Sequence, residues 1–173
     1  IICFTKLDLI DDKTKLEIDE YIKYYQKIGY QVYLNTDEEL KSIFKNKVTV
    51  FAGQSGAGKS TLLNRLDSNL KLDTGEVSVA LGRGKHTTRH VELIPLLDGL
   101  VADTPGFSSL TFDGMTKEDI RDNFIEFNKY RDLCEYKDCM HNNETICSIK
   151  EKVSNGEIIQ SRYDNYIKFI NEK

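Results

Sequence analysis

The sequence predicts an α/β protein with a mainly parallel sheet and helices on both faces, followed by a small helical unit. Up to residue 112, short apolar segments alternate with segments of helical periodicity, and strands linked by helices favour a parallel sheet. After Met115 the strand signal stops, and three cysteines and a histidine lie close together. We therefore expect two domains, 1–112 and 113–173.

The composition is that of an ordinary globular protein. The 173 residues suffice for one α/β domain with a core and a small satellite. Hydrophobic residues make up 39% and charged residues 30%. The sequence has neither an apolar run of the ~18 residues typical of a membrane span nor a charged-then-apolar leader, so we expect no membrane segment and no signal peptide. The net charge of −4 gives no overall bias toward nucleic acid, so RNA binding would need a local basic patch.

The elements alternate along the first domain. We expect strands at 1–4, 30–34, 48–52, 91–97 and 100–103, and helices at 14–28, 37–45 and 59–66. Gly29 ends the first helix as a C-cap residue. Asp98-Gly99 predicts the turn of an antiparallel hairpin between the last two strands. Residues 74–90, with several Gly, Thr and charged residues, predict a long flexible loop. In the second domain, Thr116 to Asp119 form a capping-box pattern that opens a helix.

A phosphate-binding loop is predicted at residues 53–61, GQSGAGKST. The segment fits G-x4-G-K-[ST] and lies between the strand VTVFA and the helix TLLNRL, as this motif requires. Its glycines let the backbone approach phosphates, and its free N–H groups form an anion cradle. Lys59 should reach the outer phosphates, Ser60 should bind Mg²⁺ and Thr61 should contact the α-phosphate. The expected contacts are Gly53, Gln54, Ser55, Gly56, Ala57, Gly58, Lys59, Ser60 and Thr61.

A second motif, Asp103-Thr-Pro-Gly106, ends the strand GLVAD. A carboxylate at a strand end beside a phosphate loop is placed to hold the hydration shell of Mg²⁺. The N–H of Gly106 can meet the γ-phosphate, and loss of that phosphate would release the loop. An ordinary turn is the alternative interpretation of these four residues, and the phosphate loop disfavours it.

The first strand ends in Thr5-Lys6-Leu7-Asp8, the pattern of a guanine-recognition loop. Asp8 can accept hydrogen bonds from N1–H and the exocyclic amine of guanine. Adenine offers no such donors, so a buried Asp8 would be left unpaired and ATP rejected. The stem of Lys6 would cover the base. Ordinary GTPases place this loop after the phosphate and Mg²⁺ loops, whereas here it comes first, so the sequence predicts a circularly permuted sheet whose loops still meet at one edge.

A metal site is predicted in the second domain. Cys134, Cys139, His141 and Cys147 form C-x4-C-x-H-x5-C, a set suited to a closed tetrahedral Zn²⁺ site. Three clustered thiols cannot all pair with one another, so a disulfide framework is disfavoured.

Together these features resemble the RsgA (YjeQ/YloQ) family of small-ribosomal-subunit biogenesis GTPases, over essentially the entire chain. The resemblance rests on the permuted order, GQSGAGKST, the loop GKHTTRH at 84–90, DTPGF at 103–107 and the Cys₃His set. It implies a protein that binds GTP and GDP with Mg²⁺, binds the 30S subunit late in its assembly and hydrolyses GTP when the subunit stimulates it. It also implies a zinc domain that contacts rRNA. We expect a cytoplasmic monomer.

The chain departs from the family pattern at several points. Thr5 stands where the family usually has Asn, so we expect loss of a contact to the base or to the phosphate loop. Asn35-Thr36 stands where a Ser-Ala loop normally backs the base. Family members carry an N-terminal OB-fold domain and GTPase sheets normally have six strands, whereas we count five and find no initiator Met. The sequence therefore predicts a fragment of a longer protein, with the missing strand and helix before Ile1.

The catalytic group is predicted from the loop GKHTTRH. Phe107 follows the DTPG motif where Ras-like GTPases place a water-orienting Gln, and a phenyl ring cannot orient water, so intrinsic hydrolysis should be slow. His86 matches the family's proposed catalytic histidine, and Thr88, in preference to Thr87, should bind Mg²⁺ and the γ-phosphate. The alternative interpretation leaves His86 and His90 as solvated loop residues.

Three other functions fit parts of the pattern. A permuted GTPase of the large subunit is disfavoured by the Cys₃His set after DTPGF. An ATP-using P-loop enzyme is disfavoured by Asp8. A non-catalytic zinc module that binds RNA is disfavoured by the intact Lys59, Ser60 and Asp103.

Overall fold

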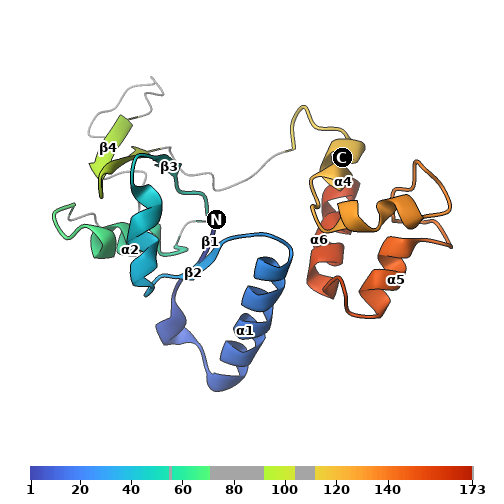
Figure 1. The fold of residues 1–173 in the computed structure, drawn as a ribbon, viewed down its shortest axis with the longest axis horizontal. Coiled ribbons are helices and arrows are strands. Elements are labelled where there is room, and N and C mark those ends of the chain that lie inside the picture. Colours follow the sequence, from blue (N-terminus) through green and yellow to red (C-terminus); the bar gives the residue numbers. More distant parts are fainter. Residues whose placement is uncertain (55, 71–91, 104–111, 173) are drawn as a thin grey trace. The chain divides into compact units, whose positions relative to one another are not determined.

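The computed structural model describes residues 1–54, 56–70, 92–103 and 112–172. The chain divides into two compact units, an N-terminal unit of Ile1–Leu110 and a C-terminal unit of Thr111–Lys173 (Figure 1). Within the described residues, no helix combines the length and the apolar character needed to cross a membrane.

The N-terminal unit contains two small sheets. Parallel strands β1 (Ile2–Phe4) and β2 (Val32–Leu34) form the first. The second has the order β3-β5-β4, formed by β3 (Val48–Val50), β5 (Gly99–Asp103) and β4 (Glu92–Leu96). In it β3 is parallel and β4 antiparallel to β5. All five predicted strands are present, but the prediction that they share one hydrogen-bonded sheet is wrong for the described residues, because no ladder there joins β1 to β3.

Helix α1 (Asp12–Lys27) is the predicted first helix. It begins after Asp11, whose carboxylate accepts the N–H of Thr14 at 2.8 Å. It ends before Gly29, whose φ of 107° is the left-handed conformation expected of a C-cap glycine. Helix α2 (Lys59–Leu66) has the predicted bounds. The helix predicted at 37–45 is instead the 3₁₀ helix η2 (Glu38–Phe44).

The hairpin between β4 and β5 turns one residue earlier than predicted. Leu97 and Asp98 occupy the turn with φ of 47° and 58°, the pair of positive values that a two-residue hairpin favours. Gly99 instead pairs with Leu96 as the first residue of β5. A Cβ on Gly99 would lie 2.0 Å from the carbonyl oxygen of Phe44, so this glycine is required for a close approach between backbones.

The core of the N-terminal unit lies on one face of the β3-β5-β4 sheet. Leu62, Leu63 and Leu66 of α2 and Leu40 and Phe44 of η2 pack there with Leu96 and Val101. On the opposite face, Val48, Val50 and Leu93 are 61%, 50% and 48% exposed. In the described residues the buried core of this sheet therefore lies on the face covered by α2 and η2.

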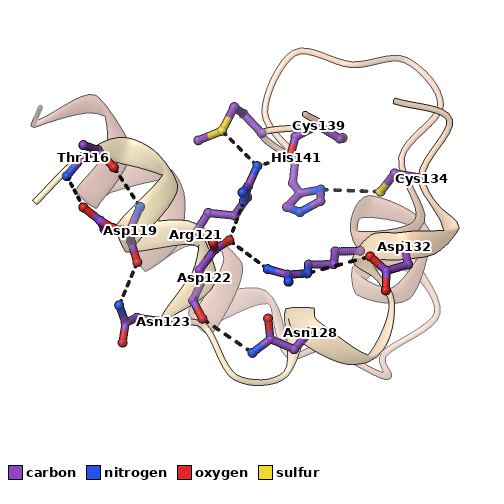
Figure 2. A network of polar contacts seen from close by, with 12 residues as sticks. Thr116, Asp119, Arg121, Asp122, Asn123, Asn128, Asp132, Cys134, Cys139 and His141 are labelled. Atoms are coloured by element: carbon purple, nitrogen blue, oxygen red, sulfur yellow. Dashed lines mark hydrogen bonds and ion pairs between the residues drawn. The ribbon is translucent and has the colours of Figure 1, made fainter. Parts of the chain in front are cut away.

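The C-terminal unit is helical. It contains α4 (Lys117–Asp122), α5 (Ser148–Ser154) and α6 (Gln160–Asn171), with short 3₁₀ helices at Phe127–Lys129 and Arg131–Leu133. The capping box that opens α4 is confirmed: the hydroxyl of Thr116 accepts the N–H of Asp119, and the Asp119 carboxylate accepts the N–H of Thr116 (Figure 2). The core of the C-terminal unit contains Phe127, Ile149, Ile158 and Tyr166, together with Cys139 and Cys147.

Candidate nucleotide and metal sites

The predicted phosphate loop connects β3 to α2. Gly56 and Gly58 have φ of 76° and 92°, so a side chain at either position would strain the backbone, as the motif requires. Gly53 differs, because a Cβ there would meet only ordinary contacts, the nearest at 3.6 Å on Ala57. Ser55 lies outside the described residues. The loop therefore has the glycine conformations of a phosphate cradle at two of its three glycines.

Lys59 and Ser60 open α2 directly after the loop. The Lys59 ammonium donates to the carbonyl oxygens of Gly53 and Gln54 at 2.6 and 2.8 Å, so it lies inside the curve of the loop. Ser60 is buried and Thr61 is exposed. The loop therefore places a cation and a hydroxyl at the helix N-terminus, where both could meet phosphate oxygens and Mg²⁺.

Thr5 joins the base-recognition loop to the phosphate loop. Its hydroxyl donates to the carbonyl oxygen of Ala57 at 2.6 Å, and a Cβ on Gly58 would lie 3.5 Å from the Thr5 side chain. Thr5 thus keeps a hydrogen bond to the phosphate loop, although its side chain is shorter than Asn. The two predicted nucleotide loops meet although they lie far apart in the chain.

The rest of the base-recognition loop is exposed. Lys6 has a left-handed φ of 59° and starts the short 3₁₀ turn Leu7–Leu9. Asp8 is exposed, so the expectation of a buried carboxylate is wrong for the protein alone. Asn35, at the end of β2, donates its N–H to the carbonyl of Phe4, and its side-chain oxygen is buried with no partner among the described residues.

Several predicted residues lie outside the described part of the chain. They are His86, Thr87, Thr88, His90, Gly106 and Phe107, together with the side chain of Asp103. The backbone of Asp103 ends β5, which runs parallel to the strand that leads into the phosphate loop. Because neighbouring parallel strands end at the same edge of a sheet, the backbone of residue 103 lies at the edge from which the phosphate loop starts.

The structure brings the predicted metal ligands together. The ligand atoms of Cys134, Cys139, His141 and Cys147 all lie within 4.8 Å of one another. The Cys134 and Cys147 sulfurs are 3.9 Å apart, and His141 Nδ1 lies 3.6 and 3.4 Å from them. Tetrahedral zinc with Zn–S of about 2.3 Å and Zn–N of about 2.0 Å would place two sulfurs about 3.8 Å apart and sulfur about 3.5 Å from nitrogen. The donor set therefore fits a tetrahedral cation.

His141 is held in the form that binds a metal. It is 1% exposed, and burial, followed by the nearby Arg121 charge, lowers the pKa of its imidazole to about 4, so the ring is neutral. Its Nδ1 faces the sulfurs, while Nε2 is buried without a hydrogen-bond partner in the part of the chain that the structure describes. The Phe127 ring packs edge-to-face against the imidazole at 5.6 Å. The neutral ring thus offers Nδ1 to the cluster.

The three thiols have different surroundings. Burial raises the pKa of Cys147, and it raises that of Cys139 to about 12. At Cys134 burial also acts upward, but hydrogen bonds from the Ser148 side chain and backbone outweigh it and lower the pKa. The one proton of the Ser148 hydroxyl can go to this sulfur, 3.0 Å away, or to the carbonyl of Tyr130, 2.6 Å away, and donation to the sulfur favours the thiolate. Binding of a cation would favour the thiolate at all three positions, since metal ligation requires deprotonated sulfur.

A polar network lies beside the cluster (Figure 2). Arg121 of α4 donates to the carbonyl of Cys139 at 3.3 Å and to the Met140 sulfur at 3.6 Å. Its Nε pairs with Asp122 at 2.8 Å, and Arg131 pairs with the same carboxylate at 2.9 Å. Sequence reasoning missed Arg121 because a single arginine on a helix carries no signal of which distant carbonyl it meets.

Comparison with known proteins settles the family. The RsgA GTPase family model matches residues 1–113. The chain belongs to the RsgA GTPase family. It is 49% identical over 178 residues to small ribosomal subunit biogenesis GTPase RsgA 2 of Oceanobacillus iheyensis, covering 99% of this chain and 61% of that protein. It is 48% identical over 179 residues to RsgA of Bacillus subtilis, covering 99% of this chain and 60% of that protein.

Solved structures agree with the RsgA assignment. YloQ, described as a circularly permuted GTPase, matches with a TM-score of 0.77 and 40% identity, over 99% of this chain and 56% of that one. YjeQ from Thermotoga maritima matches with a TM-score of 0.75 and 34% identity, over 98% of this chain and 58% of that one. The predicted permuted GTPase fold is therefore confirmed. The chain spans about 60% of the length of the curated relatives named above.

Proposed function

We propose that this chain is the nucleotide-binding and zinc-binding part of a factor that hydrolyses GTP during late maturation of the 30S ribosomal subunit, and that the subunit stimulates hydrolysis. The RsgA relatives are named small ribosomal subunit biogenesis GTPases, which supports this assignment. The observation that carries the nucleotide-binding part of the proposal is the 2.6 Å hydrogen bond from Thr5 to Ala57, which joins the base-recognition loop to the phosphate loop. We assign the GTPase domain to residues 1–112 and the zinc domain to 113–173.

The nucleotide site uses backbone and side-chain groups of both loops. The N–H groups of residues 53–61 cradle the phosphates, and Lys59 leaves its carbonyl partners for the outer phosphates. Asp8 accepts from guanine and Lys6 covers the base, while Thr5 holds their loop against the phosphate loop. Because the Asp8 carboxylate pairs with the N–H donors of guanine, the site selects GTP and GDP over adenine nucleotides.

Mg²⁺ would be held by Ser60 and Thr88, with Asp103 bonded to its hydration shell. The buried Ser60 hydroxyl at the start of α2 fits this role. When bound, the ion neutralises charge on the β- and γ-phosphates. The Gly106 N–H contacts the γ-phosphate in the GTP state. His86 orients the attacking water once the subunit orders its loop, because Phe107 offers no polar group for this task.

The Cys₃His cluster binds one structural Zn²⁺ per chain. Its sulfur and nitrogen separations and its neutral imidazole support this choice, as does the absence of an open position in a set of four protein ligands. A bound ion would cross-link residues 134, 139, 141 and 147, the last of which is the N-cap residue of α5. The zinc domain contacts rRNA, and the protein acts as a cytoplasmic monomer without a membrane partner.

Nucleotide selectivity tests the site directly. The wild-type chain should bind a fluorescent GDP analogue that excess GTP displaces and excess ATP does not. Lys59→Ala should weaken binding because the phosphates lose their cation, whereas Lys13→Ala, on the exposed side of α1, is the matched control and should bind normally. Equal displacement by ATP and GTP would contradict guanine recognition by Asp8.

A further inference from the structure

The turn that carries two of the metal ligands has an unfavourable backbone conformation. His141, between Met140 and Asn142, has a φ of 55°, in the left-handed region that non-glycine residues rarely adopt. This conformation turns the imidazole so that Nδ1 lies 3.4 Å from the Cys147 sulfur. Some other part of the structure must therefore hold the turn in place.

Glu144 contacts this turn from within the same loop. One carboxylate oxygen accepts the N–H of Met140 at 2.7 Å, and the other accepts the N–H of Asn142 at 2.8 Å. The two bonds bracket His141, since they engage the residues immediately before and after it. Lys150 of α5 donates to the carbonyl of Glu144 at 2.8 Å, which anchors the bracket itself. A carboxylate that accepts two N–H groups forms charge-assisted hydrogen bonds, the stronger class.

Three other side chains donate hydrogen bonds to the carbonyl groups of the same turn. Arg121 of α4 donates to the carbonyl of Cys139 at 3.3 Å. Tyr166 and Tyr163 of α6 donate to the carbonyls of Met140 and His141 at 2.5 and 2.8 Å. Each of three consecutive carbonyls thus has a side-chain donor from a helix. None of these contacts requires a metal ion.

We propose that Glu144 is the positioning residue of the metal site, which sets the left-handed backbone of His141 and thereby presents Nδ1 to the three cysteine sulfurs. The proposal rests on the proposed metal site and adds the residue that tunes its affinity. A ligand set that is ordered by its own protein contacts loses less conformational freedom when the ion binds. Partners outside the ligand set typically change metal affinity by ~10–100-fold when removed.

Zinc affinity of the full 173-residue chain, measured by competition with a chromophoric chelator, tests this role. Glu144→Ala removes both acceptors and should weaken Zn²⁺ binding ~10–100-fold. Glu144→Gln keeps one oxygen acceptor but turns an amide donor toward the other N–H, so it should lie between Glu144→Ala and the wild type. Glu135→Gln removes the same charge from an exposed position beside Cys134 and should leave the affinity unchanged. An equal loss in Glu135→Gln would mean that charge alone acts, and would overturn the proposal.

Co²⁺ substitution gives a readout that simple destabilisation would not move. Wild-type chain with Co²⁺ should show the intense visible absorption of a tetrahedral site with three sulfurs and one nitrogen. In Glu144→Gln the bands should shift as His141 disengages, while the sulfur-to-metal charge transfer persists. Tyr163→Phe, which loses only the hydroxyl bonded to the His141 carbonyl, should show a smaller shift in the same direction and covers the case in which Glu144→Ala fails to fold.

The outcomes separate this proposal from the metal site itself. If the wild-type chain takes up neither Zn²⁺ nor Co²⁺, the metal site is wrong and the role of Glu144 falls with it. If the wild type binds both ions but Glu144→Gln keeps the wild-type affinity and spectrum, the positioning role alone is wrong.

Discussion

In the N-terminal unit the phosphate loop is shaped mainly by its own backbone, whereas in the C-terminal unit the turn that carries His141 is held by side chains, one from its own loop and three from helices α4 and α6. Gly56 and Gly58 curve the phosphate loop, and the hydroxyl of Thr5 links it to the neighbouring loop. Around His141, in contrast, Glu144, Tyr163 and Tyr166 each bond to the backbone of one turn. The glycines of the phosphate loop appear in the sequence as a contiguous motif, whereas the side chains that hold the His141 turn do not.

The two sites should also respond differently to single substitutions. Loss of one metal ligand should affect the folding of its whole unit, because the cluster lies in the core with Cys139 and Cys147. Loss of one polar group in the nucleotide loops should affect ligand binding or turnover and leave the fold intact, because Thr5, Asp8 and Lys59 lie outside the buried core cluster of the unit.

The largest effect should come from Cys139→Ser. The chain should carry one Zn²⁺ per molecule by elemental analysis, and the variant should carry none. A thiolate site of this kind contributes on the order of 10 kcal/mol of apparent binding free energy to folding, as in zinc-finger peptides. Hydrogen exchange should therefore show unfolding of the C-terminal unit while GTP affinity stays near normal.

Cys3→Ser is the matched control for this prediction, because Cys3 lies in β1, away from the metal ligands in sequence and unit. It should retain its zinc. A zinc-free Cys139→Ser chain with a fully protected C-terminal unit would show that the metal does not hold that unit together.

Asp8→Asn should change the base that the chain prefers. It removes two charge-assisted hydrogen bonds to guanine, each worth about 1.5–3 kcal/mol, so the Kd for GTP should rise by two orders of magnitude or more. The Asn amide can donate to the extra oxygen of xanthine, so XTP should bind better than GTP in competition measurements. A variant that still prefers GTP would show that another residue recognises the base.

His86→Ala should lower turnover without lowering affinity. A group that acts mainly in the transition state is worth ~10²–10⁴-fold, so the 30S-stimulated rate should fall by that factor while GTP binding persists. The unstimulated rate should change far less. Phe107→Gln, added to His86→Ala, is the control, and it should not restore the stimulation of GTP hydrolysis by 30S subunits. Full stimulated turnover in His86→Ala would place the catalytic group in the rRNA or elsewhere in the loop.

Thr5→Val should have the smallest effect. It removes the hydroxyl that donates to Ala57 and leaves that carbonyl without this donor, a loss of about 0.5–1.5 kcal/mol. GTP affinity measured by titration calorimetry should fall by a few-fold to about tenfold. Thr5→Ser keeps the hydroxyl and should bind like the wild type. If both variants bind equally, the link between the two loops does not support nucleotide binding.

The contrast between the two sites explains how much of each could be predicted. Contiguous residues predicted the phosphate loop, and α2 begins at Lys59 as expected. The Cys₃His spacing predicted the ligands that the structure brings together. Glu144, in the loop, and Ser148, at the start of α5, carried no signal, because a single acidic or hydroxyl residue does not indicate which group it will meet.

Errors in the predicted fold have the same origin. The turn at Leu97-Asp98 was misplaced because glycine is the usual sign of a hairpin turn. Gly99 is instead required because the backbone of Phe44, far away in the chain, leaves no space for a Cβ. Asp8 is exposed because it lies in the short 3₁₀ turn Leu7–Leu9, in which no residue is buried. Local patterns gave the order of elements, and contacts between distant residues decided their details.

GTP turnover measured with and without purified 30S subunits decides whether the small subunit stimulates hydrolysis by this chain. We expect the chain alone to hydrolyse GTP slowly. The rate should rise markedly with 30S subunits and little with 50S subunits, and 30S subunits should not raise the rate of Lys59→Ala. Turnover that 30S subunits leave unchanged, in a chain that binds GTP normally, would contradict a role as a GTPase stimulated by the small subunit.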